Sequence, residues 1–230
     1  YEYGEGVQVD QEEAVKWYCK AAEQGDADAQ WSLGICYEYG EGVQVDQEEA
    51  VKWYRKAAEQ GNAFAQWSLG ICYEYGKGVQ VDQEEAAKWY RKAAEQGNAS
   101  AQLALGICYE YGEGVQVDQE EAVKWYRKAA EQGNAFAQWS LGICYEYGKG
   151  VQVDQEEAAK WYRKAAKQGN AFAQYYLGMC YEDGKGVPVD EKEAVKWYRK
   201  SAEQGNTDAQ YFFASCYKEG RGVSVDESEA

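Results

Sequence analysis

The chain has 230 residues, and 40 Asp and Glu against 24 Lys and Arg give it a formal net charge of -16 at pH 7. Such an acidic chain repels phosphate backbones and anionic lipids, which argues against nucleic acid or a membrane surface as the partner. Hydrophobic residues make up 45% and aromatic residues 15% of the chain, which is enough apolar surface for a packed interior and argues against intrinsic disorder. The sequence contains no run of about 18 apolar residues that could span a bilayer.

A Trp-Tyr pair recurs every 36 residues along the chain, from Trp17 to Trp197, and pairs of glycines recur with the same period. A fixed period of this length is typical of stacked supersecondary units. We therefore expect an all-α solenoid of antiparallel helix pairs in one array of about six repeats over residues 1–230. The array is expected to be cut within a repeat at both ends, as in a fragment of a longer protein.

The first helix of each unit is illustrated by the segment that follows Asn62, which is a suitable N-cap. Apolar side chains at helical spacing, including Leu69 and Tyr73, are expected to face the interior. Gly76 should end the helix. Gly70 lies inside the helix, where glycine costs about 1 kcal/mol relative to alanine, so we expect a close approach of the partner helix there.

The second helix should begin at Asp82, because Glu85 three residues later completes a capping signal. It should end at Gly97, where the next Asn caps the following helix. On its outer side, Glu48 and Lys52 have the spacing of a favourable ion pair. Each unit is thus predicted to be a helical hairpin.

These residues carry a family resemblance. The segments AQWSLGICYEYGKGVQVD (65–82) and EEAAKWYRKAAEQGN (84–98) resemble the Sel-1-like repeat, and the match covers essentially the whole chain. The resemblance implies a right-handed superhelix related to tetratricopeptide arrays and a role as an adaptor. It brings no catalytic residues. Some bacterial relatives pair two cysteines in each repeat, a pattern that a single recurring cysteine cannot form.

Two long blocks of the sequence are almost identical. Residues 34–105 and 106–177 differ only at Glu95 and Lys167, Ser100 and Phe172, Leu103 and Tyr175, and Ala104 and Tyr176. This indicates a recent 72-residue duplication or a designed sequence. Recurrence of a residue between the blocks is therefore weak evidence of function, and the positions that changed are the informative ones.

The cysteines offer no catalytic or metal site by their pattern. Six occupy one repeat position, namely Cys36, Cys72, Cys108, Cys144, Cys180 and Cys216. Equivalent helices pack about 8–10 Å apart, whereas a disulfide needs Cα atoms within about 7 Å, so we expect small buried residues and, with Cys19, seven free thiols. The chain has no histidine, the commonest base for a nucleophile. We predict no enzymatic activity, no metal and no cofactor, and free thiols favour a reducing compartment such as the cytoplasm.

A binding surface is expected on the first helices, which line the concave side in arrays of this kind. With Leu69 and Tyr73 facing inward, the opposite side of that helix presents aromatic and acidic residues. The candidate protein-binding residues are Trp31, Phe64, Trp67, Ile71, Glu74, Tyr75, Glu110, Tyr111, Phe136, Trp139, Ile143, Glu146, Tyr147, Phe172, Tyr175 and Tyr176. Most differences between repeats fall on this stripe, as in a tuned groove, although the aromatic residues could instead wedge adjacent repeats together.

The partner that fits this stripe is a protein or peptide. Aromatic anchors beside glutamates favour an extended or helical peptide with apolar and basic side chains. Two alternatives remain open at this point. The chain could be a structural element that associates end to end with other copies, or a non-catalytic accessory domain of a larger protein.

Overall fold

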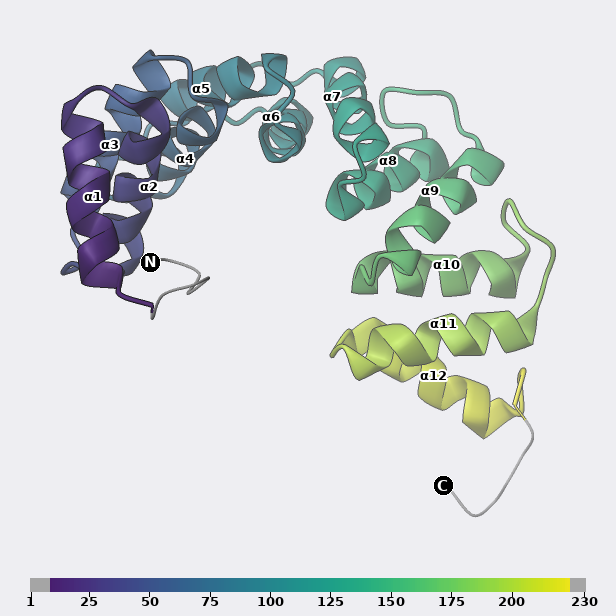
Figure 1. Cartoon of the computed structure of the whole chain (residues 1–230). Helices are drawn as coiled ribbons and strands as arrows, with labels where there is room; N and C mark the ends of the chain where they lie inside the picture. The colour runs from purple at the N-terminus through teal and green to yellow at the C-terminus, as the bar shows by residue number, and fades with distance from the viewer. Residues whose placement is uncertain (1–8, 224–230) are drawn as a thin grey trace. The chain divides into compact units, whose positions relative to one another are not determined.

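The structure, a computed structural model, describes residues 9–223 and divides into two compact units, one ending at Val117 and the other beginning at Asp118. The described residues form twelve α-helices and no strand (Figure 1), which confirms the all-α class and the 36-residue period. The helices are α1 (Gln11–Glu23), α2 (Ala27–Tyr39), α3 (Gln47–Glu59), α4 (Ala63–Tyr75), α5 (Gln83–Glu95) and α6 (Ala99–Tyr111) in the first unit, and α7 (Gln119–Glu131), α8 (Ala135–Tyr147), α9 (Gln155–Lys167), α10 (Ala171–Asp183), α11 (Glu191–Glu203) and α12 (Thr207–Glu219) in the second.

The helix ends lie where local sequence signals predict them. The Asn62 side chain accepts a hydrogen bond from the Ala65 N–H (2.8 Å), and Gly76 ends α4 with a left-handed φ of 70°. Asp82 caps α5 by accepting from the Glu85 N–H at 2.9 Å. These contacts satisfy backbone groups that a helix end otherwise leaves unpaired.

One expected ion pair is wrong. Lys52 Nζ lies 2.8 Å from a carboxylate oxygen of Glu49, three residues earlier, and not beside Glu48. Residues three and four apart are both neighbours on a helix surface, so spacing alone does not decide between the two partners.

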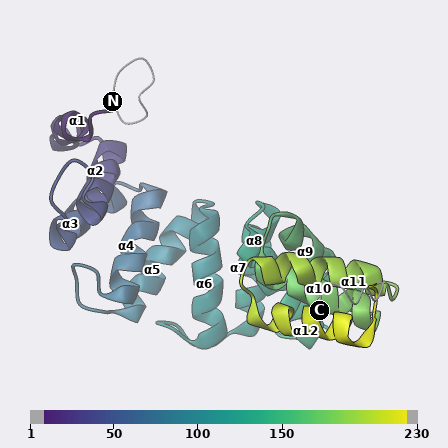
Figure 2. The ribbon, with the colours of Figure 1, turned by 90° about the horizontal axis from the view of Figure 1, so that it is seen from below.

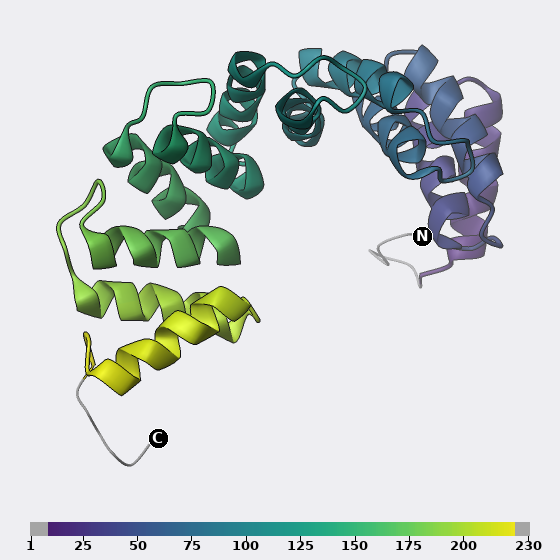
Figure 3. The same cartoon turned by 180° about the vertical axis from the view of Figure 1, so that it is seen from behind.

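Within each unit, helices that are adjacent in the chain pack against one another. In the first unit α4, α5 and α6 lie side by side in chain order (Figure 2). The connection from an odd to an even helix is short, as at residues 96–98. The connection from an even to an odd helix is longer, as at residues 148–154 and 184–190 in the second unit (Figure 3).

A tyrosine of α3, α5, α9 and α11 packs against a glycine of the even helix before it. A Cβ atom added to Gly70 would lie 2.5 Å from the ring of Tyr90, which is buried. Gly34 meets Tyr54 in the same way, and in the second unit Gly178 meets Tyr198. The close helix approach expected at Gly70 is therefore confirmed, and the buried ring offsets the poor helix propensity of glycine.

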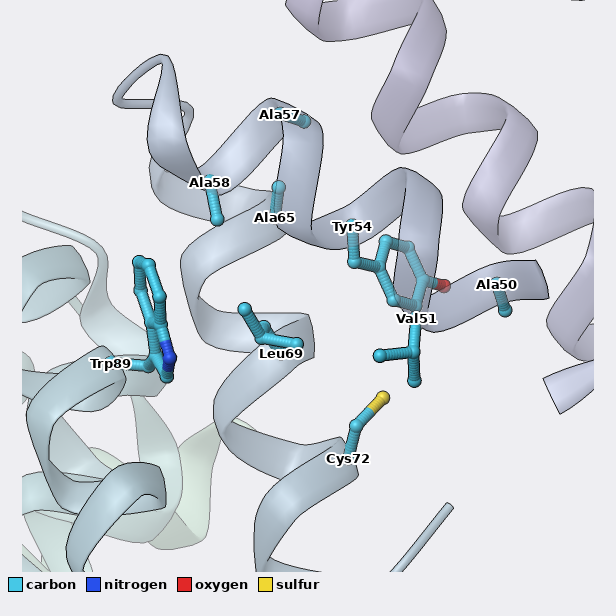
Figure 4. Packing of buried hydrophobic residues seen from close by; sticks show 9 residues of the cluster. All are labelled: Ala50, Val51, Tyr54, Ala57, Ala58, Ala65, Leu69, Cys72 and Trp89. Atoms are coloured by element: carbon cyan, nitrogen blue, oxygen red, sulfur yellow. The ribbon is translucent and has the colours of Figure 1, made fainter. Parts of the chain in front are cut away.

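A tryptophan of α3, α5 and α11 packs against the core of the helix pair before it. Trp89 of α5 packs against a cluster from α3 and α4 that includes Ala58 and Leu69 (Figure 4). The buried amide of Gln66 joins the same elements, because it donates to the Ala58 carbonyl (3.1 Å) and accepts from the Gln96 side chain (2.7 Å). The Gln66 side chain thus joins α4 to α3 and to the residue that follows α5.

We expect Gly70→Ala to lower the free energy of unfolding by about 1–3 kcal/mol through overpacking against Tyr90, although alanine raises helix propensity by about 1 kcal/mol. Urea unfolding followed by circular dichroism measures this loss. The same substitution made in a Tyr90→Leu background should cost much less, because the ring edge is gone. Equal losses in the two backgrounds would contradict this origin of the strain.

Candidate protein-binding surface

The candidate surface is the outer side of the even-numbered helices, here called the first-helix face. On α4 it comprises Phe64, Trp67, Ile71, Glu74 and Tyr75, and residues 36 positions apart take the same places on the other even helices. Offsets of three, seven and eleven from Phe64 return to the same side of an α-helix, so the apolar members form a line about 16 Å long. The caps at Asn62 and Gly76 fix where that line begins and ends.

The two ends of this line are exposed, and its middle is half-buried. Phe64 is 55% exposed and Tyr75 is 65% exposed. The other exposed candidates are Tyr111, Phe136, Tyr147 and Phe172. The half-buried candidates are Trp31, Trp67, Ile71, Glu74, Glu110, Trp139, Ile143, Glu146, Tyr175 and Tyr176.

Aromatic side chains of this face also contact one another between adjacent repeats within a unit. The ring of Trp31 lies 5.2 Å from that of Phe64, and the Trp31 Nε1 donates to the hydroxyl of Ser68 at 3.2 Å. In the second unit Trp139 lies 5.2 Å from Phe172 and 6.3 Å from Tyr176. The face therefore holds neighbouring repeats together and also offers exposed rings at both ends of each helix.

The glutamates of this face have an internal partner that sequence reasoning missed. The Tyr54 hydroxyl donates to the Glu38 carboxylate at 2.7 Å, and Lys77 of the next repeat lies 2.9 Å from its other oxygen. The Tyr90 hydroxyl donates to Glu74 in the same way. Burial first, and then the bonded carboxylate, raise the pKa of Tyr54 far above its usual value, so the phenol stays a donor.

The structure adds three exposed residues to the face. Tyr39, Ile107 and Tyr211 are 65%, 36% and 70% exposed, and they occupy the positions of Tyr75, Ile71 and the half-buried Tyr175 in other repeats. The repeat period itself is the signal that finds them.

Among residues 9–223 there is no group of three or more His, Cys, Asp or Glu side chains placed to hold a metal ion. In the same range no helix is long and apolar enough to cross a membrane. All seven cysteines are free, and six of them are buried. Burial raises the pKa of Cys72, Cys108 and Cys180 to about 12, which leaves these thiols almost entirely protonated near neutral pH.

We therefore expect Cys19 to react quickly with thiol reagents and the six buried cysteines to react slowly. At pH 8 a group of pKa 12 is ionised in only about one molecule in ten thousand, so a disulfide reagent should react promptly only with the half-buried Cys19. Unreduced protein unfolded in urea should yield seven thiols. Cys19→Arg, which copies Arg55 of the next repeat, should remove the prompt reaction and no other. Five or fewer thiols after unfolding would contradict the absence of crosslinks.

The Sel1 repeat family model matches residues 1–26, 27–62, 63–98, 99–134, 135–170, 171–206 and 207–230. A protective antigen of uropathogenic Escherichia coli that displays an SLR fold is 44% identical with a TM-score of 0.90, over 98% of this chain and 49% of the antigen. The chain thus spans about half the length of that antigen.

A Sel1 repeat protein from Oxalobacter formigenes is 37% identical with a TM-score of 0.82, over 96% of this chain and 94% of that protein. An immunity protein of Pseudomonas aeruginosa is 25% identical with a TM-score of 0.51, over 83% and 70% of the two chains. No curated protein matches the sequence. Sel1 repeats are generally protein–protein interaction scaffolds and generally non-catalytic. The sequence match over the whole length and the shared helix-pair fold agree, and the chain belongs to the Sel1 repeat family.

Proposed function

We propose that this protein is a non-catalytic scaffold that binds a segment of another protein on its first-helix face. The observation that supports this most directly is the register of exposed rings. Phe64 and Tyr75 lie at opposite ends of α4, and Phe136 and Tyr147 take the same places on α8, all at least 55% exposed. Large apolar side chains exposed at fixed places on one face are what a protein interface uses as anchors.

The half-buried middle of the face supports the same role. Trp31 is held by the Phe64 ring and by the Ser68 hydroxyl, so its position is fixed before any partner binds. A pre-ordered aromatic side chain loses little conformational freedom on binding, which favours affinity. The groove and wedge interpretations of this stripe are therefore compatible, since packing between repeats orients the rings that a partner would contact.

Not every glutamate of the first-helix face is available to a basic partner. Glu38 is bonded by Tyr54 and by Lys77, and its side chain is 9% exposed, so it has little capacity left for a basic residue. Apolar contacts to the exposed rings are consequently the main proposed source of affinity, with basic side chains useful only where no internal cation is present.

This function can be tested by affinity capture from the native cell, followed by mass spectrometry. A variant carrying Phe64→Ser, Tyr75→Ser, Phe136→Ser and Tyr147→Ser should recover its partners at least tenfold less well, because losing several aromatic anchors costs more than about 1.4 kcal/mol. It should keep its helix content, since each replaced ring is mostly exposed. The control replaces the exposed Lys16, Lys52, Lys88 and Lys124 of the odd helices by alanine. Undiminished recovery by the aromatic variant would reject the face.

End-to-end association is the second candidate, favoured by one observation. Trp17 is 53% exposed, whereas its equivalents Trp89, Trp125, Trp161 and Trp197 are 7% exposed. Trp17 could pack against helices of another copy, in the way that Trp89 packs against α3 and α4. For the scaffold we expect a constant monomer mass by light scattering across a hundredfold range of concentration. A mass that grows with concentration and reverts in Trp17→Arg would favour association instead.

A further inference from the structure

We use the word step for the contact between one even helix and the next even helix of the same unit. The step from α4 to α6 lacks the side-chain contacts that cover the tryptophan at the step from α2 to α4. At the step from α2 to α4, the Trp31 ring is covered by Phe64 and its Nε1 is bonded to Ser68. On α6, Ser100 stands in the place of the Phe64 ring and Ala104 in the place of the Ser68 hydroxyl, so Trp67 has neither of these two partners.

The side chain of Trp67 is accordingly open. In the described residues its ring has no aromatic partner, and its Nε1 donates no hydrogen bond. This Nε1 is not among the indole nitrogens that are buried without an acceptor, so it is accessible to solvent. A half-buried indole with one uncovered face and a solvent-accessible N–H is a ready anchor point for an apolar or planar side chain. Leu103 and Ile107 take on α6 the places that Trp67 and Ile71 take on α4, so they continue the apolar line of the first-helix face, and Ile107 is 36% exposed.

The charge at the same step is also uncompensated. At two other places the glutamate near the end of an even helix meets a cation from the next loop, since Glu38 meets Lys77 and Glu182 meets Arg221. After Glu74 the corresponding position is Glu113, which forms no ion pair in the described residues. A hydrogen bond to Glu74 and its charge raise the pKa of the exposed Tyr75 to about 12, with a smaller contribution from Glu113, so the two carboxylates act on one spot.

The chain contains a closed counterpart of this step. In the duplicated block the residues at the places of Ser100, Leu103 and Ala104 are Phe172, Tyr175 and Tyr176. Beyond that block, Lys185 takes the place of Glu113 and lies 3.0 Å from the carboxylate of Asp183. Phe172 and Tyr176 cover Trp139, and the Trp139 Nε1 is buried. Three of the four differences between the blocks therefore fall on this single contact.

We infer that the α4/α6 step is a discrete docking site for a peptide segment of a partner protein that carries an apolar or aromatic side chain and, three residues later or earlier, Lys or Arg. This inference rests on the proposed scaffold function and specifies its partner. The apolar side chain stacks on Trp67 beside Leu103 and Ile107. The cation lies by Glu74 and Glu113, near the end of α4 where the helix dipole also favours positive charge. Trp67 and Glu74 are seven residues apart, about 10 Å along the helix, which three residues of extended chain span.

The test uses the acetylated, amidated peptide Gly-Ser-Phe-Ser-Ser-Arg-Ser-Gly, titrated into nitrogen-15-labelled protein while the nine tryptophan indole N–H resonances are observed. Trp67→Phe identifies the Trp67 signal. We expect the Trp67 resonance to shift to saturation and the Trp139 resonance to stay still. Replacing Arg by Glu in the peptide, or Phe by Ala, should weaken binding about fivefold or more.

Two protein variants separate the site from its surroundings. Glu113→Lys should weaken the peptide about fivefold, whereas the exposed Glu95→Lys, which makes the same charge change and copies Lys167, should not. Ser100→Phe combined with Leu103→Tyr and Ala104→Tyr should abolish the Trp67 shift and leave the urea midpoint equal or higher, because the same side chains already pack in the second unit.

Several results would overturn the inference. These are no Trp67 shift, equal shifts with the Arg and Glu peptides, or a Trp67 shift that follows protein concentration without peptide, which would mean that a second copy occupies the site. If native partners are lost from the fourfold aromatic variant but kept by the triple variant that fills the site, the scaffold function stands and this docking site fails. If the fourfold variant keeps them, the scaffold function itself fails.

Discussion

The fold depends on a buried tyrosine that packs against a glycine of the preceding helix. The hydroxyl of that tyrosine donates to a glutamate on the helix that carries the glycine. Tyr90 does this with Gly70 and Glu74, so one side chain fixes both how closely α5 approaches α4 and where along α4 it sits. Burying the ring supplies about 2 kcal/mol or more of apolar stabilisation. The hydroxyl would be costly to bury alone, and the carboxylate satisfies it. Because the contact spans two helices of one repeat, it sets the geometry in which the first-helix face is presented.

That same contact changes the meaning of the acidic residues on the face. A row of glutamates at a regular spacing suggests a surface for a basic partner, yet Glu38, Glu74, Glu146 and Glu182 each accept a hydrogen bond from a buried tyrosine. Glu38 illustrates this, since Tyr54 and Lys77 occupy both of its oxygens. Binding and folding therefore use the same residues, and only a step that lacks the cation retains negative charge for a partner. The formal net charge of -16 affects the solubility of the chain and its choice of partners, but it does not identify a particular binding site.

The sequence predicts what is local and leaves out what joins distant residues. The caps at Asn62 and Asp82 and the close approach at Gly70 follow from the propensities of single residues within one turn. The role of Glu74 depends on Tyr90, sixteen residues away on another helix, and helical spacing carries no information about that partner. The same holds for Trp67. Its side of the helix is predictable, but whether its ring is covered depends on Ser100, which lies on the next even helix.

The two nearly identical blocks can be compared position by position once their contacts are known. A residue kept in both copies is uninformative, but a difference can be assigned a physical effect. Ser100 and Ala104 lack the two ring contacts that the other copy supplies with Phe172 and Tyr176, and an aromatic pair is worth about 0.5–1.5 kcal/mol. The first unit thus forgoes stabilisation at one step that the second unit retains. Lost packing that coincides with a half-buried indole lacking a ring partner and with a carboxylate lacking an ion pair is easier to explain by an external occupant than by drift, because drift has no reason to gather all three at one contact.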